Sequence, residues 1–210
     1  MSEDSDPLPD LSSARAARVN RAIFLLPNFL TLCAVIFGLT ALRLSGEGKP
    51  ELAMAAIFAA VVLDTADGYA ARLLGAESPI GAELDSLADF VNFGVAPGML
   101  LYQRDLHLLG WTGWIISGIY VLATGIRLAR FNVESKNAEE TKQSKWFSGL
   151  PSTGAAVAVL IADGAANIIF RPENAALLTA GAAIAASALM LSTLRVPAPF
   201  KGQGARSRDR

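Results

Sequence analysis

Four aspartates stand close together in one short stretch of this 210-residue chain: Asp64, Asp67, Asp85 and Asp89. On a helix, residues three or four positions apart share a face, so the first two would point together and so would the last two. Carboxylate oxygens are the hard ligands that suit Mg²⁺ or Mn²⁺. Two such ions can clamp an in-line displacement at phosphorus. The spacing therefore predicts a divalent-metal site.

The residues between these aspartates suit a phosphate-rich ligand. Gly68 and Gly81 would let a ligand or another backbone approach closely. Arg72, one turn after Gly68, is placed to meet a phosphate. A single aspartate near a helix start, such as Asp85, could simply cap that helix. Four carboxylates in an apolar setting would each cost about 3 kcal/mol without a partner, which favours a bound cation.

The elements that must position these residues are membrane helices. The chain is 52% hydrophobic, and its apolar residues fall in long blocks separated by short polar clusters, which is typical of a multi-span membrane protein. We expect an all-α integral membrane protein with six transmembrane helices and a short N-terminal interfacial helix. The expected spans are 23–44, 52–74, 82–101, 109–128, 152–170 and 175–194.

The chain is expected to form one domain, 23–194, between a tail with the interfacial helix, 1–22, and a basic tail, 195–210. Pro27 suits the start of the first span. The hydrophilic stretch 134–146 is expected to be the longest internal loop. In the third span, Gly94 and Pro97 are expected to bend the second half.

Basic residues indicate the orientation of these spans. Of the 18 Lys and Arg residues, all but Arg43, Lys49, Arg104 and Arg171 fall on the side of the two termini. By the positive-inside rule, that side faces the cytoplasm. We therefore expect the termini and the aspartates at the cytoplasmic face, in the bacterial cytoplasmic membrane.

Residues from Asp64 to Asp89 stand as D-x2-D-G-x2-A-R-x8-G-x3-D-x3-D. The pattern resembles the signature of the CDP-alcohol phosphatidyltransferases at every fixed position and gap. The resemblance implies a six-helix domain that moves a phosphatidyl-type group from a CDP-linked lipid to an alcohol and releases CMP. It implies Asp64, Asp67, Asp85 and Asp89 as ligands of Mg²⁺ or Mn²⁺, with Asp89 also the general base, and Gly68, Ala71, Arg72 and Gly81 at the CDP-lipid site. The single histidine, His107, is expected on the opposite side of the membrane, so a carboxylate must serve as base.

Further stretches resemble the phosphatidylserine synthase branch of that family: LPNFLTL (26–32), ELDSLADFVNFGVAPGML (83–100), GIRLARFNV (125–133) and FSGLPSTGAA (147–156). The implied substrates are CDP-diacylglycerol and L-serine. Arginines at a helix end could bind a carboxylate or a phosphate, or could simply anchor the helix. The candidate acceptor-binding residues are Asn92, Arg127, Arg130 and Asn132. For Asn28 and Thr31, contact with the CDP-lipid and hydrogen bonding within or between helices are equally open.

Other functions stay open at this point. An acceptor such as glycerol 3-phosphate or an inositol phosphate would favour a denser basic pocket than the arginines supply, and choline is a further option. A cation transporter would spread acidic residues across the bilayer, whereas the aspartates of this chain are expected to gather at one face. A membrane scaffold has no use for the aspartates. The family resemblance implies a homodimer among membrane lipids, and no nucleic-acid partner is expected.

Overall fold

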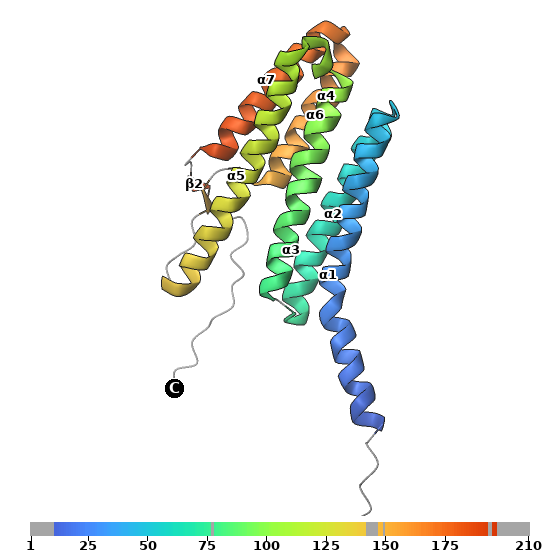
Figure 1. Ribbon diagram of the computed structural model, residues 1–210, viewed down its shortest axis with the longest axis vertical. Helices are drawn as coiled ribbons and strands as arrows, with labels where there is room; N and C mark the ends of the chain where they lie inside the picture. The colour runs from blue at the N-terminus through green and yellow to red at the C-terminus, as the bar shows by residue number, and fades with distance from the viewer. Residues whose placement is uncertain (1–10, 77, 142–146, 149, 193–194, 197–210) are drawn as a thin grey trace, which may run out of the picture.

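The structure, a computed structural model, describes residues 11–76, 78–141, 147–148, 150–192 and 195–196 (Figure 1). Two-residue strands β1 (Phe147–Ser148) and β2 (Arg195–Val196) pair antiparallel; nearly everything else described is helical. The helices are α1 (Leu11–Gly46), α2 (Pro50–Leu74), α3 (Pro79–Asp89), the π-helix η1 (Phe90–Val95), α4 (Ala96–Arg104), the 3₁₀ turn η2 (Leu106–Leu109), α5 (Trp111–Thr141), α6 (Ser152–Ile169) and α7 (Pro172–Leu191).

Five of the described helices are long and apolar enough to cross a membrane. They are α1 from Leu26 onward, α2, α5 as far as Ser135, α6 and α7. The prediction of a helical membrane protein with several spans is confirmed. The count of six is not confirmed, because the expected third span is divided among α3, η1 and α4, each too short to cross alone.

The start of the chain differs from expectation. Leu11 to Gly46 form one continuous helix, so a separate interfacial helix is not confirmed. Pro27 lies inside α1 rather than at its start, and that prediction is wrong. The expected tails at 1–10 and 197–210 lie outside the described residues.

The helix α5 also runs further than expected. The prediction of a loop across 134–146 is wrong for residues 134–141, which continue α5 to Thr141. Glu, Lys and Ala, which make up much of this stretch, are strong helix formers, so a polar sequence does not by itself end the helix. The rest of the predicted loop, 142–146, lies outside the described residues.

Between α3 and α4 the chain keeps a helical path through the π turn. The Ala96 N–H donates to the Val91 carbonyl, five residues back. The buried Tyr120 hydroxyl of α5 donates to the Phe93 carbonyl at 2.9 Å, which gives that carbonyl of the irregular turn a partner. Irregular backbone at membrane depth is tolerated where neighbouring helices supply such partners. Gly94, one of the two residues expected to bend this segment, lies in the π turn, and Pro97, the other, lies in the first turn of α4.

The helices pack closely through small residues. In Figure 1, α1 and α2 lie side by side, with α3 beside their lower parts, while α5 and α7 form the other flank. Gly98 of α4 shows how close these contacts are, because a Cβ there would lie 2.7 Å from Val121 Cγ2. Small residues let helix backbones approach in a membrane, where apolar side chains gain little by leaving lipid. The packing holds the α2–α3 hairpin, and with it the aspartates, against α1.

Candidate active site between α2 and α3

A tight hairpin brings the aspartates together. Gly75, with a left-handed φ of 59°, ends α2, a conformation that glycine adopts without strain. Three residues later, Ser78 caps α3 by accepting a hydrogen bond from the Gly81 N–H at 3.0 Å, and Pro79 occupies the first turn, where its missing N–H is harmless. These signals end α2 and start α3 within a few positions, and both helices pack against α1.

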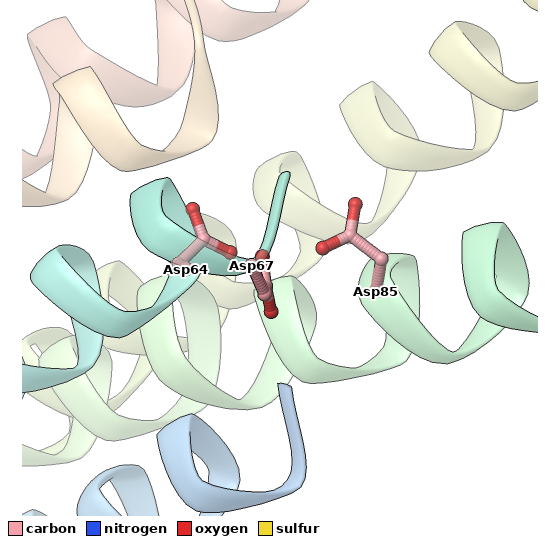
Figure 2. A group of neighbouring side chains, drawn as sticks. All are labelled: Asp64, Asp67 and Asp85. Atoms are coloured by element: carbon pink, nitrogen blue, oxygen red, sulfur yellow. The ribbon is translucent and has the colours of Figure 1, made fainter. Parts of the chain in front are cut away.

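Three of the four predicted carboxylates converge across this hairpin. Asp64 and Asp67 come from α2 and Asp85 from α3, and one oxygen from each lies within 4.8 Å of the others (Figure 2). Asp67 is buried, Asp64 is half-buried, and Asp85 is exposed. The group therefore has one side closed by protein and one side open to a ligand.

Asp89 lies one turn beyond Asp85, at the end of α3. Its carboxyl group is within hydrogen-bonding reach of Asp64, and Arg127 of α5 is close enough to attract it electrostatically. Two carboxylates this close repel each other unless a cation or a proton lies between them. The structure thus joins all four predicted aspartates in one acidic cluster.

Two oxygens of this cluster suit a metal ion. Asp67 Oδ1 and Asp89 Oδ1 are buried, and neither has a hydrogen-bond partner among the described residues. Buried polar atoms are normally paired, so each exception needs an explanation. Hard oxygen donors from three or four carboxylates, with one open side, match the way proteins hold Mg²⁺ or Mn²⁺ beside a phosphate substrate. The residues present therefore fit a divalent metal.

The predicted CDP-lipid residues surround the same hairpin. Gly68, Ala71 and Arg72 lie on α2 beyond Asp67, with Arg72 exposed in the last turn. Gly81 lies in the first turn of α3, where a Cβ would come 3.0 Å from Asn28 Oδ1. A glycine at this position accordingly lets the Asn28 side chain of α1 approach the start of α3.

Thr31 lies one turn after Asn28 on α1 and points to α2. Its hydroxyl donates to Asp67 Oδ2 at 2.5 Å, and both side chains are buried, with 5% and 3% of their surface exposed. Of the two interpretations left open by the sequence, the structure provides the hydrogen bond between helices.

The four predicted acceptor-binding residues differ in burial and in their hydrogen-bond partners. Arg127 is half-buried, donates to Ser152 Oγ at 2.9 Å, and keeps a buried Nε without a hydrogen-bond partner among the described residues. Arg130 is exposed, and its Nη1 donates to the Leu191 carbonyl at 3.0 Å. Asn132 accepts from Ser86 of α3 at 3.0 Å. Asn92 in η1 is fully buried against Gly38 of α1.

Comparison with known protein families identifies the family to which this chain belongs. Residues 24–195 match the family model described as CDP-alcohol phosphatidyltransferase. The chain belongs to the CDP-alcohol phosphatidyltransferase family.

Several curated relatives carry one name. The chain is 42% identical over 146 residues to a CDP-diacylglycerol–serine O-phosphatidyltransferase of Mycobacterium leprae, covering 68% of this chain and 48% of that protein. It is 34% identical over 172 residues to the protein of that name from Bacillus subtilis, covering 82% and 89%. For the Methanocaldococcus jannaschii protein of that name the identity is 33% over 177 residues, covering 84% and 76%. This phosphatidyltransferase chain therefore spans about half the length of the mycobacterial relatives and most of the other two.

A second acidic cluster lies at the other end of this phosphatidyltransferase fold. Asp105, which follows α4, and Asp163 of α6 are both buried, and the Thr179 hydroxyl lies within hydrogen-bond distance of both, 3.1 Å from Asp105 Oδ2 and 3.3 Å from Asp163 Oδ1. Asn167 also donates to Asp105 at 2.7 Å, and Arg104 Nε lies 3.6 Å from Asp163. The expectation that acidic residues gather at one face is therefore wrong. This second cluster contains an ion pair between Arg104 and Asp163, as a structural cluster does.

The sequence reasoning missed three features of the phosphatidyltransferase site. It did not assign Ser86, whose hydrogen bond ties α3 to α5; it did not foresee the partner of Thr31; and it did not detect the π turn after Asp89. None of these has a local signal in the sequence. Asp163 did have one, because an aspartate in the middle of an apolar span usually has a partner or a function.

Proposed function

We propose that this chain transfers the phosphatidyl group of CDP-diacylglycerol to the hydroxyl of L-serine, giving phosphatidylserine and CMP. The observation that carries the proposal is the convergence of Asp64, Asp67 and Asp85 within 4.8 Å across the α2–α3 hairpin, in a chain of the CDP-alcohol phosphatidyltransferase family. The names of the curated relatives support serine as the acceptor.

The metal role is assigned to the four aspartates. Asp64, Asp67, Asp85 and Asp89 hold Mg²⁺ or Mn²⁺, as two ions. The bound metal neutralises charge on the pyrophosphate and on the departing CMP. Asp67 and Asp89 each bring a buried oxygen with no protein partner among the described residues, which supports this use.

The hairpin holds the CDP group of the lipid. Gly68 supports this assignment, because a Cβ there would meet nothing within 4 Å and the space beside α2 is open. Arg72, exposed one turn further on, contacts a phosphate. Ala71, Gly81 and Asn28 complete the CDP-lipid contacts, whereas Thr31 acts through its hydrogen bond to Asp67.

Asp89 takes the proton from the serine hydroxyl. The hydroxyl oxygen attacks the phosphorus that carries diacylglycerol, the bond from that phosphorus to the CMP oxygen breaks, and CMP leaves with that electron pair. Asp89 suits the task because its Oδ1 is buried and unpartnered among the described residues and because it lies beside the other carboxylates. The chain's main contribution is to orient the two substrates and to place charge in advance.

Arg127 is the best-supported contact for the acceptor. Its unpartnered, buried Nε and its position near Asp89 suit the carboxylate of serine. Arg130, Asn132 and Asn92 complete the acceptor side. The amide atoms of Asn92 are buried and have no hydrogen-bond partner among the described residues, which supports a polar role for this side chain.

The membrane placement is part of the proposal. The segment 79–104, made of α3, η1 and α4, crosses the membrane as the third span in chain order. With the five long helices it gives six spans, so residues 23–194 form a six-span unit. The active site and both termini face the cytoplasm of a bacterial inner membrane, where serine and CMP are soluble. The active protein is a homodimer.

The test is an assay of CMP release by the purified full chain in detergent. CDP-diacylglycerol is offered with L-serine, glycerol 3-phosphate, inositol 1-phosphate or choline, and the lipid product is identified by mass spectrometry. Each reaction is repeated after chelation with EDTA and after Mg²⁺ or Mn²⁺ is restored.

We expect CMP to be released with serine but with none of the other three acceptors. We expect this release only when Mg²⁺ or Mn²⁺ is present. Turnover with a different acceptor and not with serine would show that the acceptor assignment is wrong but would leave the phosphatidyl-transfer reaction in place. Unchanged turnover after chelation would overturn the metal role. A chain that releases no CMP with any acceptor would overturn the transferase proposal.

A further inference from the structure

Among the described residues, the Thr31 hydroxyl joins α1 to the Asp64, Asp67 and Asp85 group through a side-chain hydrogen bond to Asp67. The donor lies on α1 and the acceptor on α2, 36 positions later in the chain. Both side chains are buried, so water does not compete for the contact. The bond fixes one carboxylate oxygen of Asp67 and leaves the other, Oδ1, buried without a hydrogen-bond partner among the described residues.

The hydroxyl has a choice of acceptors. Thr31 Oγ1 lies 2.5 Å from Asp67 Oδ2 and 3.1 Å from the Pro27 carbonyl. A hydroxyl carries one proton and can donate to one of them at a time. The shorter contact is to the carboxylate, and a hydrogen bond to a charged acceptor is about twice as strong as one to a neutral group. The proton therefore goes to Asp67.

We propose that Thr31 is a positioning residue that holds Asp67 in the rotamer in which Oδ1 faces the metal. The inference rests on the metal role given to Asp67 above. It assigns Thr31 a place behind the ligand rather than a direct contact with nucleotide. Groups that orient a metal ligand in this way typically change metal affinity by about 10- to 100-fold when they are removed.

Thr40 provides a matched control on the same helix. It is also a threonine of α1, but its hydroxyl donates to the Ile36 carbonyl at 2.7 Å, within α1 itself. Replacing it with valine makes the same chemical change nine positions further along α1. Any general effect of a β-branched apolar side chain in α1 will appear in both variants.

The experiment measures Mn²⁺ binding to the purified full chain without substrate, by the loss of the free-ion EPR signal. Thr31→Val is expected to weaken Mn²⁺ binding by at least 10-fold, whereas Thr31→Ser, which keeps the hydroxyl, and Thr40→Val are expected to bind like the wild type. In the CMP-release assay, the Mn²⁺ concentration for half-maximal rate should rise in Thr31→Val, and the KM for CDP-diacylglycerol at saturating Mn²⁺ should stay unchanged.

The outcomes separate this inference from the proposed function. If the wild type binds no Mn²⁺, the metal role falls and the Thr31 inference falls with it. If the wild type binds and Thr31→Val binds equally well, only the Thr31 inference is wrong. A raised KM for CDP-diacylglycerol with unchanged Mn²⁺ affinity would make Thr31 a nucleotide contact instead. If Thr31→Val does not fold, Thr31→Cys keeps a similar size with a much weaker donor, and wild-type Mn²⁺ affinity in it would refute the inference.

Discussion

Asp89→Asn is the most direct test of the catalytic proposal. The amide keeps the shape of the carboxyl group but loses its charge and its ability to take a proton. A positioned general base contributes about 10²- to 10⁴-fold to rate, which is about 3 to 5 kcal/mol of barrier. The described residues offer no spare base at the site, because the neighbouring Asp64 and Asp85 are assigned to the metal and His107 lies in η2 after α4. We therefore expect kcat to fall by about 10³-fold or more.

The assay is CMP release at saturating serine and saturating Mn²⁺, with CDP-diacylglycerol binding followed separately by thermal shift. The lipid should still stabilise Asp89→Asn. Asp105→Asn is the control, since it neutralises another buried aspartate at the far end of the same segment, and its kcat should stay within about threefold of the wild type. A kcat in Asp89→Asn within tenfold of the wild type would refute the base assignment. Recovery of kcat only at high Mn²⁺ would make Asp89 a ligand and not the base.

Two further pairs of substitutions test the acceptor contact and the second acidic cluster. In steady-state kinetics, Arg127→Gln should raise the KM for serine at least 10-fold and leave the KM for CDP-diacylglycerol unchanged. Arg130→Gln removes an exposed arginine from the same helix and should raise the KM for serine less. Equal effects of the two substitutions would contradict the assignment of Arg127 to the acceptor. Asp163→Ala removes a fully buried partner of Arg104 and should lower the free energy of unfolding in detergent by about 3 to 5 kcal/mol. Glu51→Ala removes the exposed partner of the same arginine and should cost less than about 1 kcal/mol; a similar loss in both variants would show that burial of the pair does not matter.

The aspartate cluster was predictable because its geometry is local. Asp64 and Asp67 share a face by helical spacing, and the residues from Gly75 to Pro79 stop one helix and start the next within a few positions. A short connection keeps the end of one helix close to the start of the next, although α2 and α3 pack mainly against α1 rather than against each other. The residues of the hairpin therefore contain most of the information needed to bring the carboxylates together.

The supporting contacts were not predictable in the same way. The Thr31–Asp67 and Ser86–Asn132 hydrogen bonds each join residues on different helices, 36 and 46 positions apart. Whether such side chains meet depends on how far each helix is rotated about its axis and slid along its neighbour. Hydropathy identifies the spans but fixes neither quantity, so the sequence left Thr31 with two open interpretations.

The π turn η1 was also not predictable, because it depends on how α5 packs against it. This packing has a consequence for the site. Tyr120 and Arg127 are seven positions apart on α5 and so lie on one face of that helix. Tyr120 provides a partner for the Phe93 carbonyl in the π turn, and Arg127 lies close enough to attract Asp89 at the start of the turn. π turns inside helices are frequent at functional sites. One face of α5 thus fixes both the irregular backbone and the charge beside the proposed base, so a shift of α5 along its axis would disturb Asp89 even if the α2–α3 hairpin did not move.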